Sequence, residues 1–136
     1  MTPGERRLVL VVDNDPEVSS CLSVRLEAAG FDVISAADGE SGLTSALENL
    51  PDAVVLDIRM PKMDGLAVLR ELRANPATAD IPVVVLSANT RDQNQAIEAG
   101  ASYFVAKPYE AKSVLTAIES AIRKRGADER LLSAVD

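Results

Sequence analysis

The sequence contains no histidine, so the most common general base and the most common metal-binding side chain are both excluded. Any chemistry must rest on carboxylates, hydroxyls, amides or lysine. Tryptophan is also absent and aromatic residues make up only 3% of the chain, whereas 47% of it is hydrophobic, so the core must be aliphatic. With 136 residues, the chain has the length of one domain.

Signals for secretion, membrane insertion and nucleic-acid binding are also missing. Cys21 is the only cysteine, so no disulfide can form within the chain and a cytoplasmic setting is expected. Residues 1–7 have no apolar core of the signal-peptide kind, and no apolar run approaches the roughly 18 residues that span a bilayer. The net charge of −7 is unfavourable for binding the phosphate backbone of nucleic acids. We therefore expect no membrane partner and no direct nucleic-acid partner.

Five short apolar runs alternate with five segments of helical periodicity. The runs are 8–12, 31–35, 53–56, 82–86 and 102–105, and each reads as a buried strand. The helices are expected at about 16–29, 39–50, 65–74, 91–99 and 111–124. This alternation predicts an α/β fold in which a five-stranded parallel sheet has helices on both faces, a doubly wound (βα)5 sandwich of three layers.

Smaller signals give the boundaries and faces of these elements. Asp15 before Pro16 and Thr90 are expected to cap helices, and Asp64-Gly65 reads as a turn and cap. The second helix should present Leu43, Ala46, Leu47 and Leu50 on one apolar face, and Cys21 should lie near the core. We expect a mobile lead over 1–7, one domain over 8–125 and a C-terminal tail or linker stub over 126–136.

Chemically capable side chains follow four of the predicted strands. Asp13, Asn14 and Asp15 follow the first, Asp57 the third and Ser87 the fourth, and Lys107 comes shortly after the fifth. Because the carboxyl ends of parallel strands meet at one edge of a sheet, these side chains should converge there. Crowded carboxylates repel one another, and Mg2+ with oxygen ligands relieves that repulsion. A cation, a lysine and a hydroxyl around a nucleophilic carboxylate suit a phosphoryl group.

Four motifs in this order resemble the receiver domain of bacterial two-component response regulators, including the chemotaxis regulators. They are residues 11–16 (VVDNDP), 56–65 (LDIRMPKMDG), 86–88 (LSA) and 107–108 (KP), and the resemblance covers roughly residues 8–124. It implies a flavodoxin-like strand order of 2-1-3-4-5. It also implies a phosphorylation-dependent signalling switch with at most slow self-phosphorylation and dephosphorylation, not a metabolic enzyme.

The resemblance also implies roles for individual residues. Asp57 would accept phosphate from a histidine kinase or a histidine phosphotransfer protein, with Ser87 and Lys107 assisting. Mg2+ would be held by Asp13, Asn14, Asp57 and the backbone carbonyl of Arg59. Ser87 and Phe104 would move on phosphorylation, and the residues near the phosphate would be Arg59, Ala88 and Asn89.

The resemblance further implies that the Lys107-Pro108 bond is cis and that a downstream protein reads one face of the domain. This face comprises the helix after Thr90, the strand 102–105 and the helix 111–124. A homodimer is a further partner that the resemblance leaves open.

Asn14 departs from the family pattern, in which two adjacent acidic residues usually follow the first strand. An amide oxygen can bind Mg2+ but brings no charge, so weaker Mg2+ binding is expected. This leaves open a receiver-like module that binds partners without phosphorylation. A second alternative is a phosphohydrolase of the haloacid dehalogenase type with Asp13 as nucleophile, although Glu17 departs from its motif and Asp57 would have no role. A dinucleotide-binding fold is excluded because the first strand-to-helix turn has no glycine.

Overall fold

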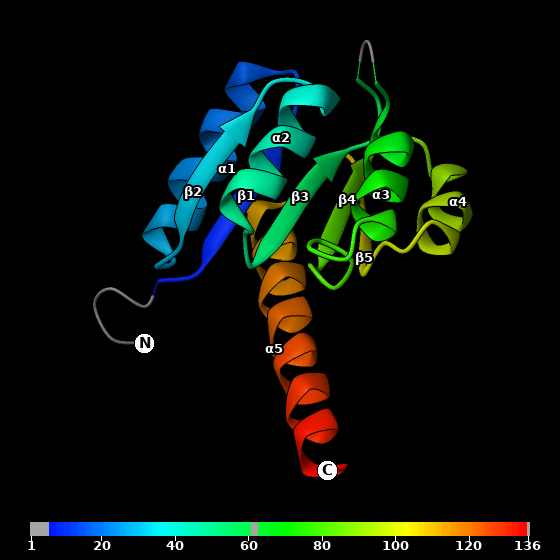
Figure 1. The fold of residues 1–136 in the computed structure, drawn as a ribbon. Coiled ribbons are helices and arrows are strands. Elements are labelled where there is room, and N and C mark those ends of the chain that lie inside the picture. The colour runs from blue at the N-terminus through cyan, green and yellow to red at the C-terminus, as the bar shows by residue number, and fades with distance from the viewer. Residues whose placement is uncertain (1–5, 61–62, 136) are drawn as a thin grey trace.

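Five parallel strands form a central sheet, and their order across it is β2-β1-β3-β4-β5 (Figure 1). The computed structural model describes the backbone of residues 6–60 and 63–135, and the side chains of these residues up to Glu129. The strands are β1 (Leu8–Val12), β2 (Asp32–Ala36), β3 (Ala53–Asp57), β4 (Val83–Ser87) and β5 (Tyr103–Ala106). The helices are α1 (Pro16–Ala28), α2 (Gly39–Asn49), α3 (Gly65–Ala74), α4 (Asp92–Glu98) and α5 (Ala111–Val135). The predicted alternation and the flavodoxin-like strand order are both confirmed.

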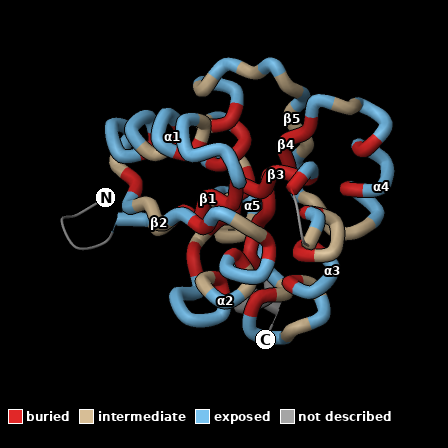
Figure 2. Tube along the Cα trace, turned by 90° about the horizontal axis from the view of Figure 1, so that it is seen from above, coloured by how far each residue is buried: buried red, intermediate tan, exposed pale blue. Residues whose placement is uncertain are grey.

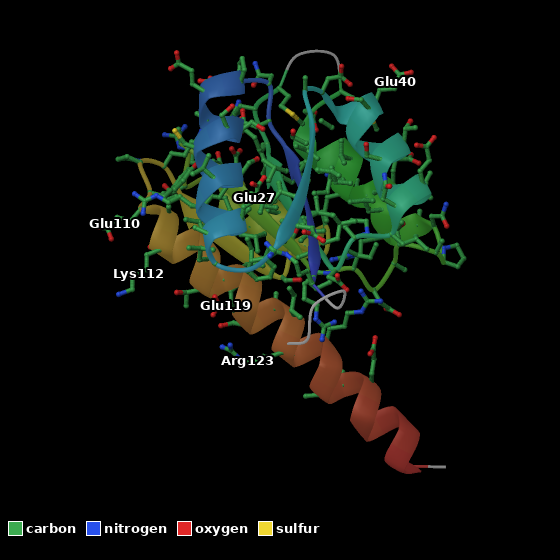
Figure 3. All side chains as sticks on the ribbon, turned by 90° about the vertical axis from the view of Figure 1, so that its left-hand side faces the viewer. Glu27, Glu40, Glu110, Lys112, Glu119 and Arg123 are labelled. Atoms are coloured by element: carbon green, nitrogen blue, oxygen red, sulfur yellow. The ribbon has the colours of Figure 1, made fainter. Side chains whose placement is uncertain are left out.

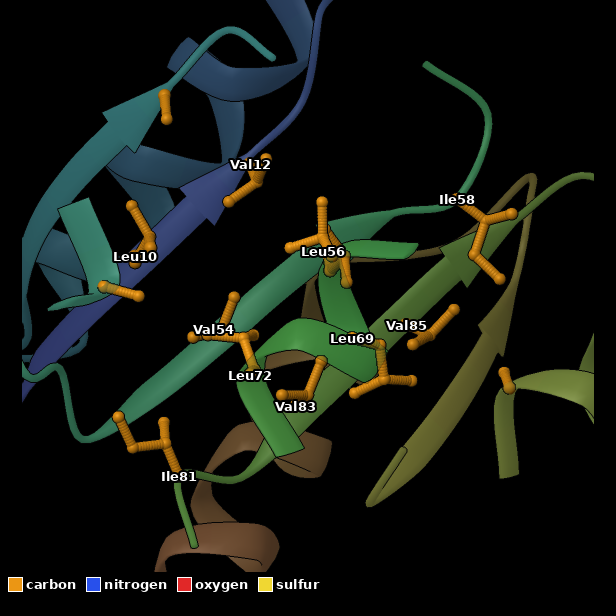
Figure 4. Close-up of a cluster of buried hydrophobic side chains, with 14 of the residues drawn as sticks. Leu10, Val12, Val54, Leu56, Ile58, Leu69, Leu72, Ile81, Val83 and Val85 are labelled. Atoms are coloured by element: carbon orange, nitrogen blue, oxygen red, sulfur yellow. The ribbon is translucent and has the colours of Figure 1, made fainter. Parts of the chain in front are cut away.

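The core consists of two aliphatic clusters, one on each face of the sheet. Helices α2, α3 and α4 cover one face and α1 and α5 cover the other. Figure 2 shows the buried strands running between helices whose outer sides are exposed. Because both faces of β1, β3 and β4 are covered, these strands are continuous apolar runs. Figure 4 shows the cluster under α3, whose labelled residues are Leu10, Val12, Val54, Leu56, Ile58, Leu69, Leu72, Ile81, Val83 and Val85.

Two of the expected helix caps are present and one is not. The Asp15 side chain accepts from the backbone N–H groups at the start of α1, and Asp64 Oδ1 accepts from the backbone N–H of Ala67 at 2.9 Å in α3. Thr90 was expected to cap α4, and this prediction is wrong. Helix α4 begins at Asp92 without a side-chain cap, because a turn held by Asn89 precedes it: Asn89 Oδ1 accepts from the Arg91 backbone N–H at 2.9 Å.

Three side chains expected in or near the core are exposed instead. Leu47 is 45% exposed and Leu50 is 54% exposed, although Leu43 and Ala46 pack on the sheet as predicted. Leu50 follows the last residue of α2 and has a left-handed backbone with φ of 45°, which takes it off the helical face. Cys21 is exposed because α1 turns Leu22 and Leu26 toward the sheet and Cys21 to one side.

Helix α5 is longer than the sequence pattern indicated. We expected it to end near Lys124, but it continues without a break to Val135, past the edge of the sheet (Figures 1 and 3). Val114, Ile118 and Ala121 are buried against the sheet. Gly126 does not end the helix, and an ion pair between Arg125 and Glu129 at 3.1 Å joins two successive turns across it. Most of the expected tail 126–136 is therefore helical, and Asp136 lies outside the described residues.

The first strand begins close to residues that we had assigned to a lead. Arg6 forms an ion pair with Asp32 at 3.0 Å, and Arg7 lies 3.6 Å from Asp52, so both contact the domain. Residues 1–5 of the expected lead lie outside the described residues. Within 6–60 and 63–135, no helix is long and apolar enough to cross a bilayer.

Arg73 connects the end of α3 to two loops at the amino-terminal edge of the sheet. Its guanidinium donates twice to the carbonyl of Gly100, at 3.0 and 2.8 Å. It also donates to the carbonyls of Ala79 at 3.1 Å and Ile81 at 2.7 Å. Burial lowers the pKa of Arg73, and the charge of Asp80 opposes that shift. One planar fork of donors thus fixes the α3–β4 loop and the turn after α4 together.

Replacing Arg73 by Lys should lower the free energy of unfolding by roughly 1–3 kcal/mol, because an ammonium group cannot meet three carbonyls from one position. Urea unfolding followed by circular dichroism measures the loss. Arg70 provides the matched control, since it lies on the exposed side of the same helix. Arg70→Lys should change stability by less than about 0.5 kcal/mol. Equal effects of the two substitutions would show that the Arg73 contacts do not stabilise the fold.

Candidate functional site

The register of the sheet brings three strand ends together. Asp57, the last residue of β3, lies opposite Leu86 of β4, and Ser87, the last residue of β4, lies opposite Ala106 of β5. On the other side, Val12 lies opposite Leu56, so Asp13 follows directly beside the end of β3. The order of β1 and β3 in the sheet makes this a switch point, where doubly wound folds bind ligands.

Asp57 is almost fully buried, with 4% of its surface exposed, and the ammonium group of Lys107 lies next to its carboxylate. Lys107 Nζ is 3.3 Å from Asp57 Oδ2, and the backbone N–H of Arg59 donates to Asp57 Oδ1 at 3.3 Å. The backbone N–H of Lys107 donates to the carbonyl of Ser87 at 2.8 Å, which fixes the start of the loop after β5. The Lys107-Pro108 bond in that loop is cis, as the resemblance implied. The predicted meeting of Asp57 and Lys107 is thus observed.

Gly65 makes the backbone of the Asp57 loop possible. A Cβ at this position would lie 2.6 Å from both the carbonyl oxygen of Asp57 and the Cα of Ile58. The backbone N–H of Gly65 also donates to the Ile58 carbonyl at 2.9 Å. The glycine that the sequence indicated as a turn residue therefore serves a close backbone approach directly behind Asp57.

Asp13 has a buried oxygen without a partner. The residue is 3% exposed, and its Oδ1 accepts from the backbone N–H of Asp15 at 2.8 Å. Its Oδ2 is buried with no hydrogen-bond donor, among the side chains that the structure describes. Burial and then the charge of Asp57 raise the pKa of the Asp13 carboxyl, against opposing contributions from the Asp15 N–H and Lys107. Burying a charged carboxylate in this position costs free energy unless a cation binds to it.

These oxygens fit a hard divalent cation. Asp13 Oδ2 and the Asp57 carboxylate are the charged donors, and Asn14, which is exposed on the same loop, would add a neutral amide oxygen. No three acidic, histidine or cysteine side chains gather into a metal-binding group within the described residues. The predicted set is two carboxylates completed by an amide and a backbone carbonyl, for a cation that keeps several waters.

The Ser87 hydroxyl is bound to a residue that the sequence pattern did not indicate. Ser87 Oγ donates to Asp92 Oδ2 at 2.6 Å and accepts from the Asn89 backbone N–H at 3.1 Å. The guanidinium of Arg59 donates to both oxygens of the same carboxylate, each at 3.3 Å. Asp92 is buried at the start of α4. An acidic residue at a helix start reads only as a dipole or cap residue, so no sequence signal revealed this contact.

The remaining predicted residues surround these groups less closely. Phe104 is half-buried and packs at the margin of the core on the α2–α4 face, and Ala88 is exposed after Ser87. Tyr109, which the sequence did not indicate, lies near the carboxylates. Burial, and then the charges of Asp13 and Asp57, raise the pKa of its hydroxyl to about 12. Tyr109 therefore stays neutral, and it lines a pocket between α1 and α5 with Cys21.

Residues 9–119 match the family described as the response regulator receiver domain, so the chain belongs to that family of two-component signalling modules. It is similar to the transcriptional regulatory protein PrrA of Mycobacterium tuberculosis, with 43% identity over 121 residues. That match covers 88% of this chain and 51% of PrrA, so the chain spans about half the length of this curated relative.

Solved structures agree with this assignment. A response regulator from Chloroflexus aurantiacus aligns with a TM-score of 0.84 and 30% identity over 88% of this chain and 99% of its own. The receiver domain of the sensor histidine kinase PA1611 from Pseudomonas aeruginosa aligns with a TM-score of 0.80 and 28% identity, covering 86% of this chain and 98% of its own. In that structure a magnesium ion is coordinated in the active-site cleft.

Replacing Asp13 by Asn should stabilise the metal-free protein by on the order of 1 kcal/mol near pH 7, because a buried, unpaired carboxylate charge is removed. The sign follows from the raised pKa. The folded protein disfavours the charged form, so the wild-type free energy of unfolding falls as the pH rises through the ordinary value of 3.8 toward the raised one. The advantage of the variant should vanish below a pH of about 4. Urea titrations in EDTA across this range measure it.

Asp15→Asn is the control for this prediction, because Asp15 is an exposed cap and Asn caps equally well. It should leave stability near pH 7 within about 0.5 kcal/mol. Adding Mg2+ should then stabilise wild type more than Asp13→Asn. A loss of stability in the metal-free Asp13→Asn protein would contradict the assignment of Oδ2 as an unsatisfied oxygen.

Proposed function

We propose that the chain is a phosphorylation-dependent switch in which Asp57 accepts a phosphoryl group from a histidine kinase or a histidine phosphotransfer protein. The observation that carries the proposal is the geometry at the end of β3. A buried carboxylate has Lys107 on one oxygen, and the unpartnered oxygen of Asp13 belongs to the neighbouring strand end. Membership of the receiver family supports the same reaction.

In the proposed transfer, a bond forms between an Asp57 carboxylate oxygen and the phosphorus of a phosphohistidine. The P–N bond breaks, and its electron pair stays on the imidazole nitrogen. Lys107, held by its backbone bond to Ser87, would stabilise a phosphoryl oxygen. Mg2+, when held by Asp13, Asn14, Asp57 and the backbone carbonyl of Arg59, would neutralise charge on the phosphoryl oxygens. The magnesium ion in the related PA1611 receiver supports this set.

The output would be a change in population between two arrangements of the loop after β4 and the α4–β5–α5 face. Ser87 would turn its hydroxyl toward the phosphoryl group, and Phe104 would change its packing. The partner would be a downstream protein or a second copy of the chain, in the cytoplasm. PrrA is named a transcriptional regulatory protein, so control of transcription is one proposed output. With a net charge of −7, this chain is not expected to bind nucleic acid directly.

The two alternatives predict different behaviour. A phosphorylation-independent module rests on Asn14, which supplies no charge to the metal site. The phosphohydrolase alternative needs a phosphorylated Asp13. Among the residues that the structure describes, no lysine forms an ion pair with the buried Asp13, whereas Lys107 pairs with Asp57. Neither alternative gives the pairing of Lys107 with Asp57 a role.

Incubating the protein with acetyl phosphate and Mg2+ should add one phosphoryl mass to the wild type and none to Asp57→Asn. The substitution replaces the nucleophilic carboxylate with a neutral amide of nearly the same shape, and intact-mass spectrometry measures the result. EDTA should abolish labelling, and Asp13→Asn should slow it by roughly tenfold or more, since one charged metal ligand is lost.

Asp64→Asn is the matched control, because it makes the same chemical change on the following loop and preserves the cap of α3. It should be labelled like the wild type. A label that survives Asp57→Asn and disappears in Asp13→Asn would support the phosphohydrolase. An absence of label with acetyl phosphate and with a phosphohistidine donor would support the phosphorylation-independent module.

A further inference from the structure

Asp92 joins two residues that flank the proposed phosphorylation site. Its Oδ2 accepts from the Ser87 hydroxyl at 2.6 Å and from Arg59 Nε at 3.3 Å, and its Oδ1 accepts from Arg59 Nη2 at 3.3 Å. Arg59 also donates its backbone N–H to Asp57. We call this set the Arg59–Asp92–Ser87 linkage. It connects the loop after β3 with the first turn of α4.

The hydroxyl of Ser87 has a single proton. It lies within reach of the Asn89 carbonyl at 3.3 Å and of Asp92 Oδ2 at 2.6 Å, and the much shorter contact to the carboxylate is the favoured one. The bond of 2.6 Å to a carboxylate is short and charge-assisted, which places it among the stronger hydrogen bonds of proteins. It is also buried, so water does not compete for it. While Ser87 donates to Asp92, it cannot donate to a phosphoryl oxygen on Asp57. Asp92 and the phosphoryl group therefore compete for one proton.

Arg59 holds the carboxylate in place for that competition. Its guanidinium contacts both oxygens of Asp92, one of which is the oxygen that accepts from Ser87. The Arg59 side chain is largely exposed, so the ion pair itself should contribute little to stability. Its effect is to fix, together with Ser87, the orientation of the Asp92 carboxylate.

Helix α4 depends on this linkage because it has few other attachments. The helix is short, and only Asp92 and Ala96 of its residues are buried. Between α4 and α3 lies a surface pocket of about 480 Å3, lined in part by Arg59, Asp64 and Asp92. Opening the linkage would therefore release the first turn of α4 beside a space into which side chains can move.

We propose that Asp92 is a positioning residue for the phosphorylation reaction: it holds the Ser87 hydroxyl away from Asp57, and this bond must break before Ser87 can stabilise a phosphoryl group. The inference rests on the proposed function, since it requires a phosphoryl group at Asp57. On this proposal, the buried Ser87–Asp92 hydrogen bond, supported by Arg59, is the energy barrier between the two arrangements of the loop after β4.

The test is the initial rate of phosphorylation by acetyl phosphate with Mg2+, read by intact mass, in a double-mutant cycle of Asp92→Ala and Ser87→Ala. Asp92→Ala should raise the rate roughly five- to tenfold over the wild type, the range expected when a charge-assisted competitor for a proton is removed. In the Ser87→Ala background, Asp92→Ala should change the rate by less than about twofold, since no hydroxyl remains to be released.

Asp64→Asn controls for charge, because Asp64 lines the same pocket and does not contact Ser87 among the described residues. It should leave the rate unchanged, which separates a specific effect of Asp92 from weaker repulsion of an anionic donor. Asp92→Asn keeps the shape of the side chain and should give a smaller increase than Asp92→Ala, because its neutral amide oxygen is a weaker acceptor. If circular dichroism shows that Asp92→Ala does not fold, the rate of Asp92→Asn is compared with the wild type in its place.

The outcomes separate this inference from the proposed function. If the wild type is labelled and both Asp92 variants are labelled at the wild-type rate, the inference alone is overturned. If the increase persists in the Ser87→Ala background, Asp92 acts through its charge and the positioning role is again wrong. If no protein is labelled by either acetyl phosphate or a phosphohistidine donor, the proposed function fails and this inference fails with it.

Discussion

The need to stabilise charge at one edge of an aliphatic sheet determines the arrangement of the whole site. Asp13 and Asp57 are both buried at adjacent strand ends, where each carboxylate raises the energy of the other. Lys107 provides one positive charge to Asp57, and no described residue donates to the second oxygen of Asp13. The site is therefore short of positive charge as it stands. This shortage is what makes it suited to a divalent cation and, with the cation, to an anionic phosphoryl group.

The fold could be predicted from the sequence because both faces of the sheet are covered. Strands buried on both sides must be continuous apolar runs, and those runs are visible in residues 8–12, 53–56 and 82–86. Parallel strands place their carboxyl ends at one edge of the sheet, so the sequence predicted that Asp57 and Lys107, which are 50 residues apart, would lie at the same edge. The strand order itself needed the family resemblance, because alternation does not specify which strand lies at the centre.

Contacts that depend on loop conformation could not be predicted in the same way. Asp92 reaches Ser87 because the turn at Asn89 folds the chain back, and Arg59 arrives from a loop 33 residues earlier. No periodicity encodes either event. Leu47 and Leu50 show the converse problem: apolar residues at helical spacing were read as a core face, but the left-handed backbone at Leu50 takes that residue off it. The end of α5 was placed near Lys124, whereas the helix continues through Gly126 to Val135.

The continuous helix α5 has a mechanical consequence. At 1.5 Å per residue, the stretch 126–135 carries the helix axis about 15 Å further. The base of the helix is anchored by Val114 and Ile118 against β3 and β4, the strands that end in Asp57 and Ser87. A stiff rod fixed at one end converts a small change of angle into displacement at the other, and a tilt of about 5° over this length moves the far end by roughly 1 Å. A change of packing at the anchored end would thus move the far end of α5, which is remote from the carboxylates.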